Sequence, residues 1–277
     1  MTLKELQQNT YAKNIIDSTE VDSVLSIALH KNLEYLYKHP DKKISLGTQK
    51  KFAKLIKLRL QNWPVAYLRK NKDFFGLNFI VNKHTLIPRP DSELLVEEAL
   101  KFLNNSALRA ELESTKILDM GTGSGCLIIS LAKNSQAKFF ASDIKKAALK
   151  VARLNARKHQ VKITFYLSNL FKKIPEQKFT LILANLPYLN KDQMREPSIS
   201  REPKSALFSQ NNGLKHYEKF LQQVKNYLAE KYLILLEIDP QQSEAIKTLS
   251  KKYLPESQVD ILPDINKLDR VVKISLG

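Results

Sequence analysis

A strand that runs into a glycine-rich turn constrains this chain more than any other feature. Residues 116–120, Lys-Ile-Leu-Asp-Met, lead into Gly121-Thr-Gly-Ser-Gly125, and a helix-like segment follows from Cys126. Three of the seven glycines lie within those five residues, where the backbone must turn sharply and let a ligand approach closely. Open parallel sheets bind ligands at such turns, outside the carboxyl ends of their strands. The pattern predicts an α/β domain with a binding site at residues 121–125.

The part of the chain from residue 89 onward alternates strands with helix-length segments, which indicates a parallel sheet covered by helices on both faces. Seven strands are predicted, at 116–120, 138–142, 162–167, 179–184, 231–238, 258–262 and 270–275. The predicted helices are 91–103, 126–133, 145–158, 214–229 and 241–252. One seven-stranded, Rossmann-like sheet accommodates all of them.

The first seventy residues show apolar residues at helical spacing and no strand alternation. Asp22 is a candidate cap for one helix, and Thr48 is a candidate start for another. Alternating apolar and polar residues around Gly76 then predict a short hairpin. We therefore expect a small all-α domain at 1–72, a β-hairpin connector at 73–88 and the α/β domain at 89–277.

Composition excludes some classes of function. No run of the 277 residues approaches the ~20 apolar residues needed to cross a bilayer, and the first residues lack the apolar region of a secretory signal, so a cytoplasmic protein without membrane contact is expected. Cys126 is the single cysteine, and no ligand constellation surrounds it, which predicts no metal and a packing role for its side chain. The net charge of +17 is compatible with a nucleic-acid or acidic partner and equally with a solvated, lysine-rich surface.

A second candidate site follows the apolar run 179–184 as Asn185-Leu-Pro-Tyr188. The strand at 179–184 should lie beside the strand at 116–120, which brings this segment to the glycine turn. The Asn185 side-chain oxygen and the Leu186 carbonyl can each accept one N–H of a planar amino group. Pro187 stiffens the segment, and Tyr188 can pack its ring on the amide plane. An ordinary turn is the alternative interpretation.

Carboxylates near the glycine turn do not by themselves identify the ligand. Asp143 ends the second strand, where it can accept both hydroxyls of an adenosyl ribose in a dinucleotide or in S-adenosylmethionine; alternatively it caps the helix from Ile144. Asp119 can anchor the loop amides or approach an ammonium group. Methyl transfer to an amide nitrogen needs positioning more than a strong base, so no catalytic role is assigned to the histidines at 84, 159 and 216.

Over nearly its whole length the chain resembles the release factor glutamine methyltransferases of the PrmC/HemK type. The resemblance rests on ordered blocks of sequence: Pro64-Val-Ala-Tyr-Leu68, Leu86-Ile-Pro-Arg-Pro-Asp-Ser-Glu93, Ile117-Leu-Asp-Met-Gly-Thr-Gly-Ser-Gly125, Asn185-Leu-Pro-Tyr188, Glu202-Pro-Lys-Ser-Ala-Leu207, Leu236-Glu-Ile238 with Gln241-Gln242, and Asp269-Arg-Val-Val272.

This resemblance implies methyl transfer from S-adenosylmethionine to the glutamine side-chain amide of the Gly-Gly-Gln loop in peptide chain release factors. It implies that the glutamine is received by Asn185, Leu186, Pro187 and Tyr188. It also implies that the helical N-terminal domain contacts the release factor. No direct contact with nucleic acid is required for that reaction, and a monomer is the simplest expectation. The implied cofactor-binding residues are Gly121, Thr122, Gly123, Ser124, Gly125, Asp143, Asn169, Leu170 and Asn185.

Three positions depart from the family pattern. Leu186 replaces the first proline of the usual Asn-Pro-Pro-Tyr and matches the Asn-Leu-Pro-Tyr of ribosomal RNA adenine dimethyltransferases. Leu170 stands where tryptophan is frequent, and Lys70 where glycine is common. Three rivals therefore remain: an adenine-N6 methyltransferase acting on nucleic acid, a glutamine methyltransferase acting on a ribosomal protein, and a cofactor-binding protein that has lost catalysis. The ribosomal-protein enzymes tend to have Pro-Arg-Ser-Pro in place of residues 88–91.

Overall fold

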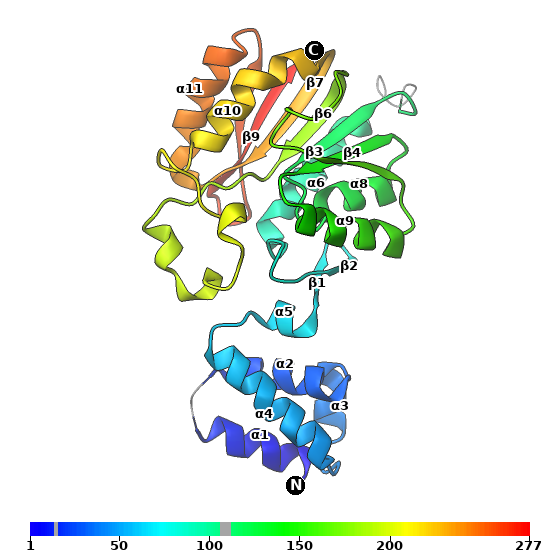
Figure 1. Cartoon of the computed structure of the whole chain (residues 1–277), viewed down its shortest axis with the longest axis vertical. Helices are drawn as coiled ribbons and strands as arrows, with labels where there is room; N and C mark the ends of the chain where they lie inside the picture. The colour runs from blue at the N-terminus through cyan, green and yellow to red at the C-terminus, as the bar shows by residue number, and fades with distance from the viewer. Residues whose placement is uncertain (14–15, 106–111) are drawn as a thin grey trace. The chain divides into compact units, whose positions relative to one another are not determined.

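The computed structural model describes residues 1–13, 16–105 and 112–277, and it places them in two units (Figure 1). Unit 1 comprises Met1–Asn71 together with Glu196–Arg201. Unit 2 comprises Lys72–Arg195 and Glu202–Gly277. None of the helices in these described ranges is long and apolar enough to cross a membrane, and the same ranges contain no cluster of three or more residues able to hold a metal ion.

Unit 1 is helical. Its helices are α1 (Leu3–Tyr11), α2 (Ser18–Leu29), α3 (Leu33–Lys38), α4 (Leu46–Leu60) and α5 (Val65–Arg69). Apolar side chains at helical spacing form a small core, which includes Leu3, Val21, Val24, Leu25, Leu36, Phe52 and Ile56. The segment Glu196–Arg201 is held to this unit by Arg201, which donates through Nε to the Gln61 carbonyl at 2.8 Å and lies over the Trp63 ring.

Both predicted helix starts in unit 1 are wrong. Asp17 caps α2 by accepting the Thr19 N–H at 2.8 Å, and Asp22 is instead buried one turn inside the helix. Its carboxylate accepts hydrogen bonds from Gln7, Tyr11 and Tyr37, a set of distant donors that the local sequence does not reveal. Ser45 caps α4 by accepting the N–H of Thr48, which lies within the helix.

The predicted hairpin is present as β1 (Asn71–Phe74) and β2 (Leu77–Ile80). Its two-residue turn, Phe75 and Gly76, has φ values of 49° and 68°, the left-handed pair required by a tight hairpin turn.

The predicted seven-stranded sheet is confirmed in unit 2, with the order β5-β4-β3-β6-β7-β9-β8. Five strands are parallel, and β9 runs antiparallel to both of its neighbours. The chain fills one side of β3 with β4 and β5 and then crosses to β6 on the other side. This reversal brings the carboxyl ends of β3 and β6 together at a topological switch point, where such sheets bind ligands. The strands are β3 (Lys116–Met120), β4 (Lys138–Asp143), β5 (Ile163–Leu167), β6 (Phe179–Ala184), β7 (Leu228–Glu237), β8 (Gln258–Pro263) and β9 (Asp269–Leu276).

Helices cover both faces of this sheet (Figure 1). Alternate strand residues point to opposite faces, so Ile182 packs with α10 (Lys215–Val224) and α11 (Ser243–Tyr253). Leu181 and Leu183 pack on the other side, in the core that α6 (Glu93–Leu103) and α8 (Cys126–Asn134) share with the end of α9 (Lys146–Lys158).

One predicted helix of this domain is too long. The segment predicted as helical to residue 229 leaves α10 after Val224, passes through a short 3-10 turn at Lys225–Tyr227 and enters β7 at Leu228. Leu228 pairs with Phe179 across a bulge. The apolar pattern at 227–229 fits helix and strand alike, and pairing with β6 decides the outcome.

Candidate functional site

The glycine turn connects β3 to α8 in a conformation that only glycine adopts without strain. Gly121, Gly123 and Gly125 have φ values of 79°, 55° and 84°. A Cβ atom on Gly125 would lie 2.9 Å from Ile129 Cδ1, and one on Gly121 would lie 3.1 Å from Leu186 Cδ2. The glycine loop therefore touches the second candidate segment directly.

These two segments line one cavity of unit 2, here called the glycine-loop cavity. The strand register explains the meeting, because Met120 of β3 pairs with Ala184 of β6 and each is followed by its candidate segment. Of the predicted residues, the cavity is lined by Gly121, Thr122, Gly123, Ser124, Asp143, Asn169, Leu170, Asn185, Leu186 and Pro187. Residues not predicted as ligands also line it, among them Thr85, Arg89, Ser92, Ile144, Lys145, Ser205 and His216.

Asp143 ties the glycine loop to the end of β4. Its Oδ2 accepts the Gly123 N–H at 3.0 Å and its Oδ1 accepts the Lys145 N–H at 2.7 Å. The N-cap residue of α9 is Lys145, so Asp143 is not the helix cap of the alternative interpretation. Burial raises the pKa of its carboxyl, and the two backbone donors oppose the rise. Each carboxylate oxygen keeps a lone pair for a ligand hydroxyl.

Asp119 lies beneath the glycine loop and holds it from inside. Its Oδ2 accepts the Thr122 hydroxyl at 2.6 Å, while its buried Oδ1 has no partner among the described residues. Burial raises the pKa of this carboxyl to about 7. The sequence predicts that Asp119 anchors the loop amides, whereas its bond in the structure comes from the Thr122 side-chain hydroxyl.

The turn after β5 supplies the side of the cavity formed by Asn169 and Leu170. Ser168 stabilises it by donating its hydroxyl to the Leu170 carbonyl at 2.7 Å and its N–H to the Asp143 carbonyl at 3.0 Å. Leu170 has a φ of 49°, unusual for a residue with a side chain. Ile144 also faces the cavity although its side chain is 53% exposed. An apolar residue directly after the strand-end aspartate is the signal that could have identified it.

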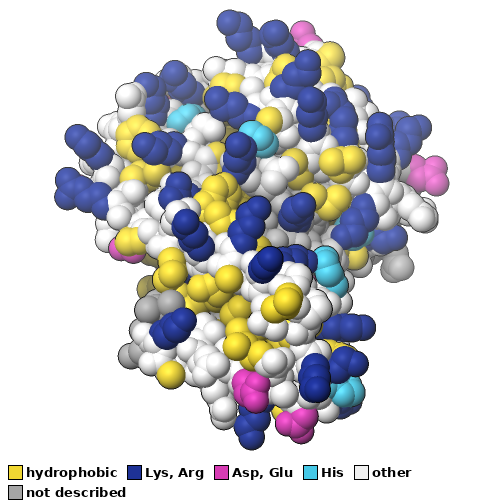
Figure 2. Space-filling view, turned by 60° about the horizontal axis from the view of Figure 1, so that its bottom comes forward, with side chains coloured by type: hydrophobic (Ala, Val, Ile, Leu, Met, Phe, Trp, Pro, Cys, Tyr) yellow, Lys and Arg dark blue, Asp and Glu magenta, His cyan; other side chains and the backbone are white. Residues whose placement is uncertain are grey.

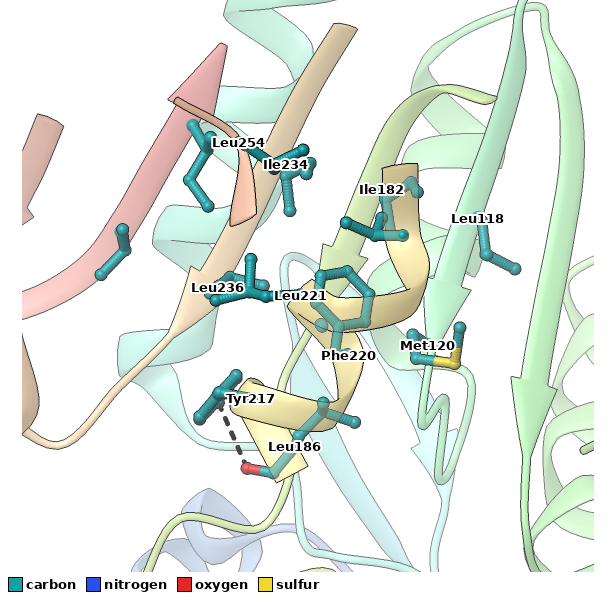
Figure 3. Close-up of a cluster of buried hydrophobic side chains, with 14 of the residues drawn as sticks. Leu118, Met120, Ile182, Leu186, Tyr217, Phe220, Leu221, Ile234, Leu236 and Leu254 are labelled. Carbon is teal, nitrogen blue, oxygen red and sulfur yellow. Dashed lines mark hydrogen bonds between the residues drawn. The ribbon is translucent and has the colours of Figure 1, made fainter. Parts of the chain in front are cut away.

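The segment Asn185–Tyr188 is held by residues distant in the sequence. The Leu186 carbonyl accepts the Tyr217 hydroxyl at 3.3 Å (Figure 3), and that hydroxyl also bonds the Glu237 carbonyl. Gln242 Nε2 donates to the Tyr188 carbonyl at 2.9 Å. A Cβ on Gly213 would overlap that carbonyl at 2.0 Å, so this glycine permits the close approach of two backbone segments.

Side chains of the segment point in two directions. Asn185 lines the cavity and donates through Nδ2 to Ser92 Oγ at 3.2 Å. Tyr188 does not line the cavity; its hydroxyl donates to the buried Glu237 Oε1 at 3.2 Å. Burial raises the pKa of both Tyr188 and Glu237. His216 Nδ1 lies 2.8 Å from Ser209 Oγ, and burial with the neighbouring lysines lowers its pKa.

The segment that precedes α6 is fixed by an ion pair between the half-buried Arg89 and the buried Glu202. Glu202, with a side chain 1% exposed, accepts the Arg89 guanidinium at 2.5 Å and the Ile87 N–H at 3.0 Å. Asp91 lies 3.6 Å from the Arg270 guanidinium, and Glu93 accepts the Phe75 N–H at 2.8 Å. The two acids therefore serve structural contacts, whereas Arg89 lines the cavity.

Comparisons with known proteins agree with this geometry. The family model described as a methyltransferase domain matches residues 111–273, and that of the PrmC N-terminal domain matches residues 7–69. A release factor glutamine methyltransferase of Buchnera aphidicola is 34% identical over 255 residues, which are 90% of this chain and 88% of that protein. One of Coxiella burnetii is 31% identical over 248 residues, 89% of this chain and 87% of that protein. The chain belongs to the release factor glutamine methyltransferase family.

Some relatives are about twice as long as the part that matches this chain. A bifunctional methyltransferase of Rickettsia bellii is 34% identical over 287 residues, which are 93% of this chain and 51% of that protein. The chain thus spans about half the length of these bifunctional relatives of the family. A solved methyltransferase from Pyrococcus furiosus aligns with 74% of this chain and 92% of its own at a TM-score of 0.54 and 16% identity, which confirms the methyltransferase fold.

Proposed function

We propose that this chain transfers a methyl group from S-adenosylmethionine to the side-chain amide nitrogen of the glutamine in the Gly-Gly-Gln motif of peptide chain release factors. The observation that carries the proposal is the shared cavity, in which the glycine loop and Asp143 lie with Asn185 and Leu186. Relatives that carry the name release factor glutamine methyltransferase, matched over about nine-tenths of this chain, support the choice of substrate.

The residues present fit the cofactor. Gly121 and Gly123 leave the backbone of the loop bare of side chains, Asp143 offers acceptors for ribose hydroxyls, and the apolar Ile144 and Leu170 offer faces for an adenine ring. Bound there, S-adenosylmethionine would supply an electrophilic methyl group on its sulfonium. The implied contacts with Thr122, Ser124, Gly125 and Asn169 belong to the same proposal.

The chain's own contribution is to grip and aim the substrate amide. Asn185 Oδ1 and the Leu186 carbonyl each accept one N–H, which leaves the nitrogen lone pair directed at the methyl donor. The Tyr217 hydroxyl uses only one of the two lone pairs on the Leu186 carbonyl. Pro187 restricts the segment, and Tyr188 stiffens it from below by its bond to Glu237. Well-oriented reactants gain on the order of 7–11 kcal/mol over free encounter, so no strong base is needed.

The helices at 1–72 are proposed to contact the release factor, and a single chain suffices because unit 2 alone lines the cavity. Translation termination places the reaction in the cytoplasm. The test is incubation with methyl-labelled cofactor and unmodified release factor, followed by mass analysis of the Gly-Gly-Gln peptide. We expect label on that glutamine, none on a release factor carrying alanine there, and none with Asn185→Ala.

The rival with specific support is an adenine-N6 methyltransferase, favoured by Leu186 and by the charge of +17. Lys and Arg side chains cover much of the face in Figure 2, and few acids lie among them. Parallel incubations with ribosomal RNA and with ribosomal proteins separate the candidates, because label confined to adenine or to a ribosomal-protein glutamine would reject the release factor. Cofactor binding without label on any of the three would indicate a protein that has lost catalysis.

A further inference from the structure

The orientation of the Asn185 amide decides whether this site presents an acceptor or a donor to its substrate. An asparagine side chain can turn its oxygen and its NH2 group through 180° with little change in shape, so only its neighbours select one orientation. Within the described residues, the side chain of Asn185 makes one hydrogen bond, from Nδ2 to Ser92 Oγ. Ser92 is therefore the residue on which the orientation depends.

Ser92 is buried, with 3% of its surface exposed, and lines the cavity. It ends the 3-10 turn Pro90–Ser92 that leads into α6, has a helical backbone with φ −68° and ψ −13°, and makes no capping hydrogen bond. Its hydroxyl is thus available for a different contact. A serine hydroxyl can either donate or accept toward an amide, so something must fix the direction of its proton.

Glu237 supplies that direction. Ala184 and Leu236 are register partners at the ends of β6 and β7, and this places Glu237 beside Asn185. The carboxyl is 1% exposed; its Oε1 accepts the Tyr188 hydroxyl, whereas its Oε2 has no hydrogen bond of good geometry among the described residues. The nearby Ser92 hydroxyl offsets part of the pKa rise that burial imposes on Glu237. An unsatisfied buried carboxylate oxygen is costly, and a small movement of the Ser92 side chain that brings its hydroxyl within hydrogen-bonding reach of Oε2 would remove that cost.

We infer that Ser92 and Glu237 form a positioning relay that fixes Asn185 with its oxygen toward the substrate. The Ser92 proton is committed to Glu237, so Ser92 Oγ accepts from Asn185 Nδ2 and the amide oxygen faces the cavity. The relay selects an amino group, which has N–H donors, over a carboxylate or ester of the same shape. The catalytic consequence rests on the proposed function; the orientation of the amide does not.

The first test needs no release factor. The side-chain NH2 resonances of Asn185, assigned by their loss in Asn185→Asp, should exchange slowly with water in the full-length protein. Ser92→Ala should accelerate that exchange about fivefold or more because the acceptor is lost, and Ser92→Thr, which retains a hydroxyl, should restore it. Ser130→Ala is the matched control, since this serine is also fully buried but its hydroxyl has no partner among the described residues. Unchanged exchange in Ser92→Ala would overturn the inference.

The second test measures selectivity. Inhibition of methylation by a release factor carrying glutamate in place of the target glutamine should be weak for the wild-type chain. In Ser92→Ala we expect stronger inhibition and a kcat lower by about tenfold, the size expected for one lost positioning hydrogen bond, with the Kd for S-adenosylmethionine within about twofold. Equal losses in kcat and cofactor affinity with unchanged selectivity would assign Ser92 to packing and overturn the inference.

Glu237→Met tests the other half of the relay, because methionine is close to glutamate in length and volume but has no oxygen to accept the Ser92 proton. Ser92 then has no acceptor for its proton and can donate to the Asn185 oxygen, so exchange should accelerate even with Ser92 intact. Retention of slow exchange in a folded Glu237→Met protein would overturn the role of Glu237. If this variant does not fold, the Ser92 pair of variants still decides the inference.

Discussion

The glycine loop and the Asn185–Tyr188 segment face the same cavity but are held in place in different ways. The loop takes its shape first from its own glycines and the nearby Asp119, and Asp143 and Asn155 hold it across 20 and 31 positions. The other segment is positioned by side chains at residues 92, 217, 237 and 242, which lie 31 to 93 positions from the residues they contact. The proposed cofactor side is therefore encoded largely by its own glycines, whereas the proposed substrate side depends on distant side chains throughout.

Removing the Asn185 side chain should give the largest effect and separate the two sides. Asn185→Ala deletes the acceptor proposed to hold the substrate amide, so kcat should fall about 10²–10³-fold, as when one polarising group is removed from an active site. The Kd for S-adenosylmethionine, measured by calorimetry, should change by less than about threefold. Asn134→Ala, on the exposed end of α8, is the control. An equal loss of cofactor affinity would show that the two sides are not separable.

Gly125→Ala should act on the opposite side. The new Cβ would lie 2.9 Å from Ile129 Cδ1 and 3.3 Å from Ala152 Cβ at a φ of 84°, and left-handed φ alone costs about 1–2 kcal/mol in a residue with a side chain. We expect the cofactor Kd to rise about tenfold. Gly76→Ala tests the cost of the left-handed backbone alone, because φ is 68° at this residue and a Cβ atom there would meet nothing within 4 Å. Similar cofactor binding by both variants would contradict the importance of the loop contacts.

The buried carboxyl of Asp119, beneath the glycine loop, should make the stability of the protein depend on pH. Because burial raises the pKa of Asp119 to about 7 from 3.8, the folded state holds this proton over a pH range in which the unfolded state has lost it. The contribution of Asp119 to stability is therefore greatest at low pH and is lost as pH rises to about 7, by up to ~1.4 kcal/mol per pH unit. Asp119→Asn should remove that slope from urea unfolding measured between pH 5 and 8. If the stability of the wild type and that of Asp119→Asn changed with pH in the same way, a raised pKa of Asp119 would be excluded.

The sequence predicts the locally encoded parts well. The seven strands lie within three residues of their predicted ends, because buried parallel strands read as short apolar runs between turn residues. The glycine loop and the Asn185 segment were predicted because each directly follows such a strand. The errors at Asp22 and at residues 225–229, and the missing roles of Ser92, Glu202 and Glu237, have one cause. Each depends on a partner distant in the chain, which pattern and propensity do not report.

The smallest predicted effect concerns one of the distant contacts of the segment Asn185–Tyr188, the hydrogen bond from Tyr217. Tyr217→Phe removes the donor to the Leu186 carbonyl while keeping the buried ring in its apolar cluster (Figure 3). Stability should fall by about 1 kcal/mol for the lost hydrogen bonding. The kcat should also fall, by about threefold to tenfold, because the carbonyl loses a fixed direction.

Tyr232→Phe supplies the comparison for that variant. Tyr232 is also buried, belongs to the same apolar cluster and bonds Ser257 through its hydroxyl, whereas the Tyr217 hydroxyl bonds the Leu186 carbonyl. It should lose a similar amount of stability, measured by urea unfolding, and retain wild-type kcat. If both variants lowered kcat by the same factor, the loss of activity would follow from the loss of stability. The contact between Tyr217 and residues 185–188 would then have no special role in the reaction. If only Tyr217→Phe did so, the tertiary contacts of residues 185–188 would set the rate through geometry.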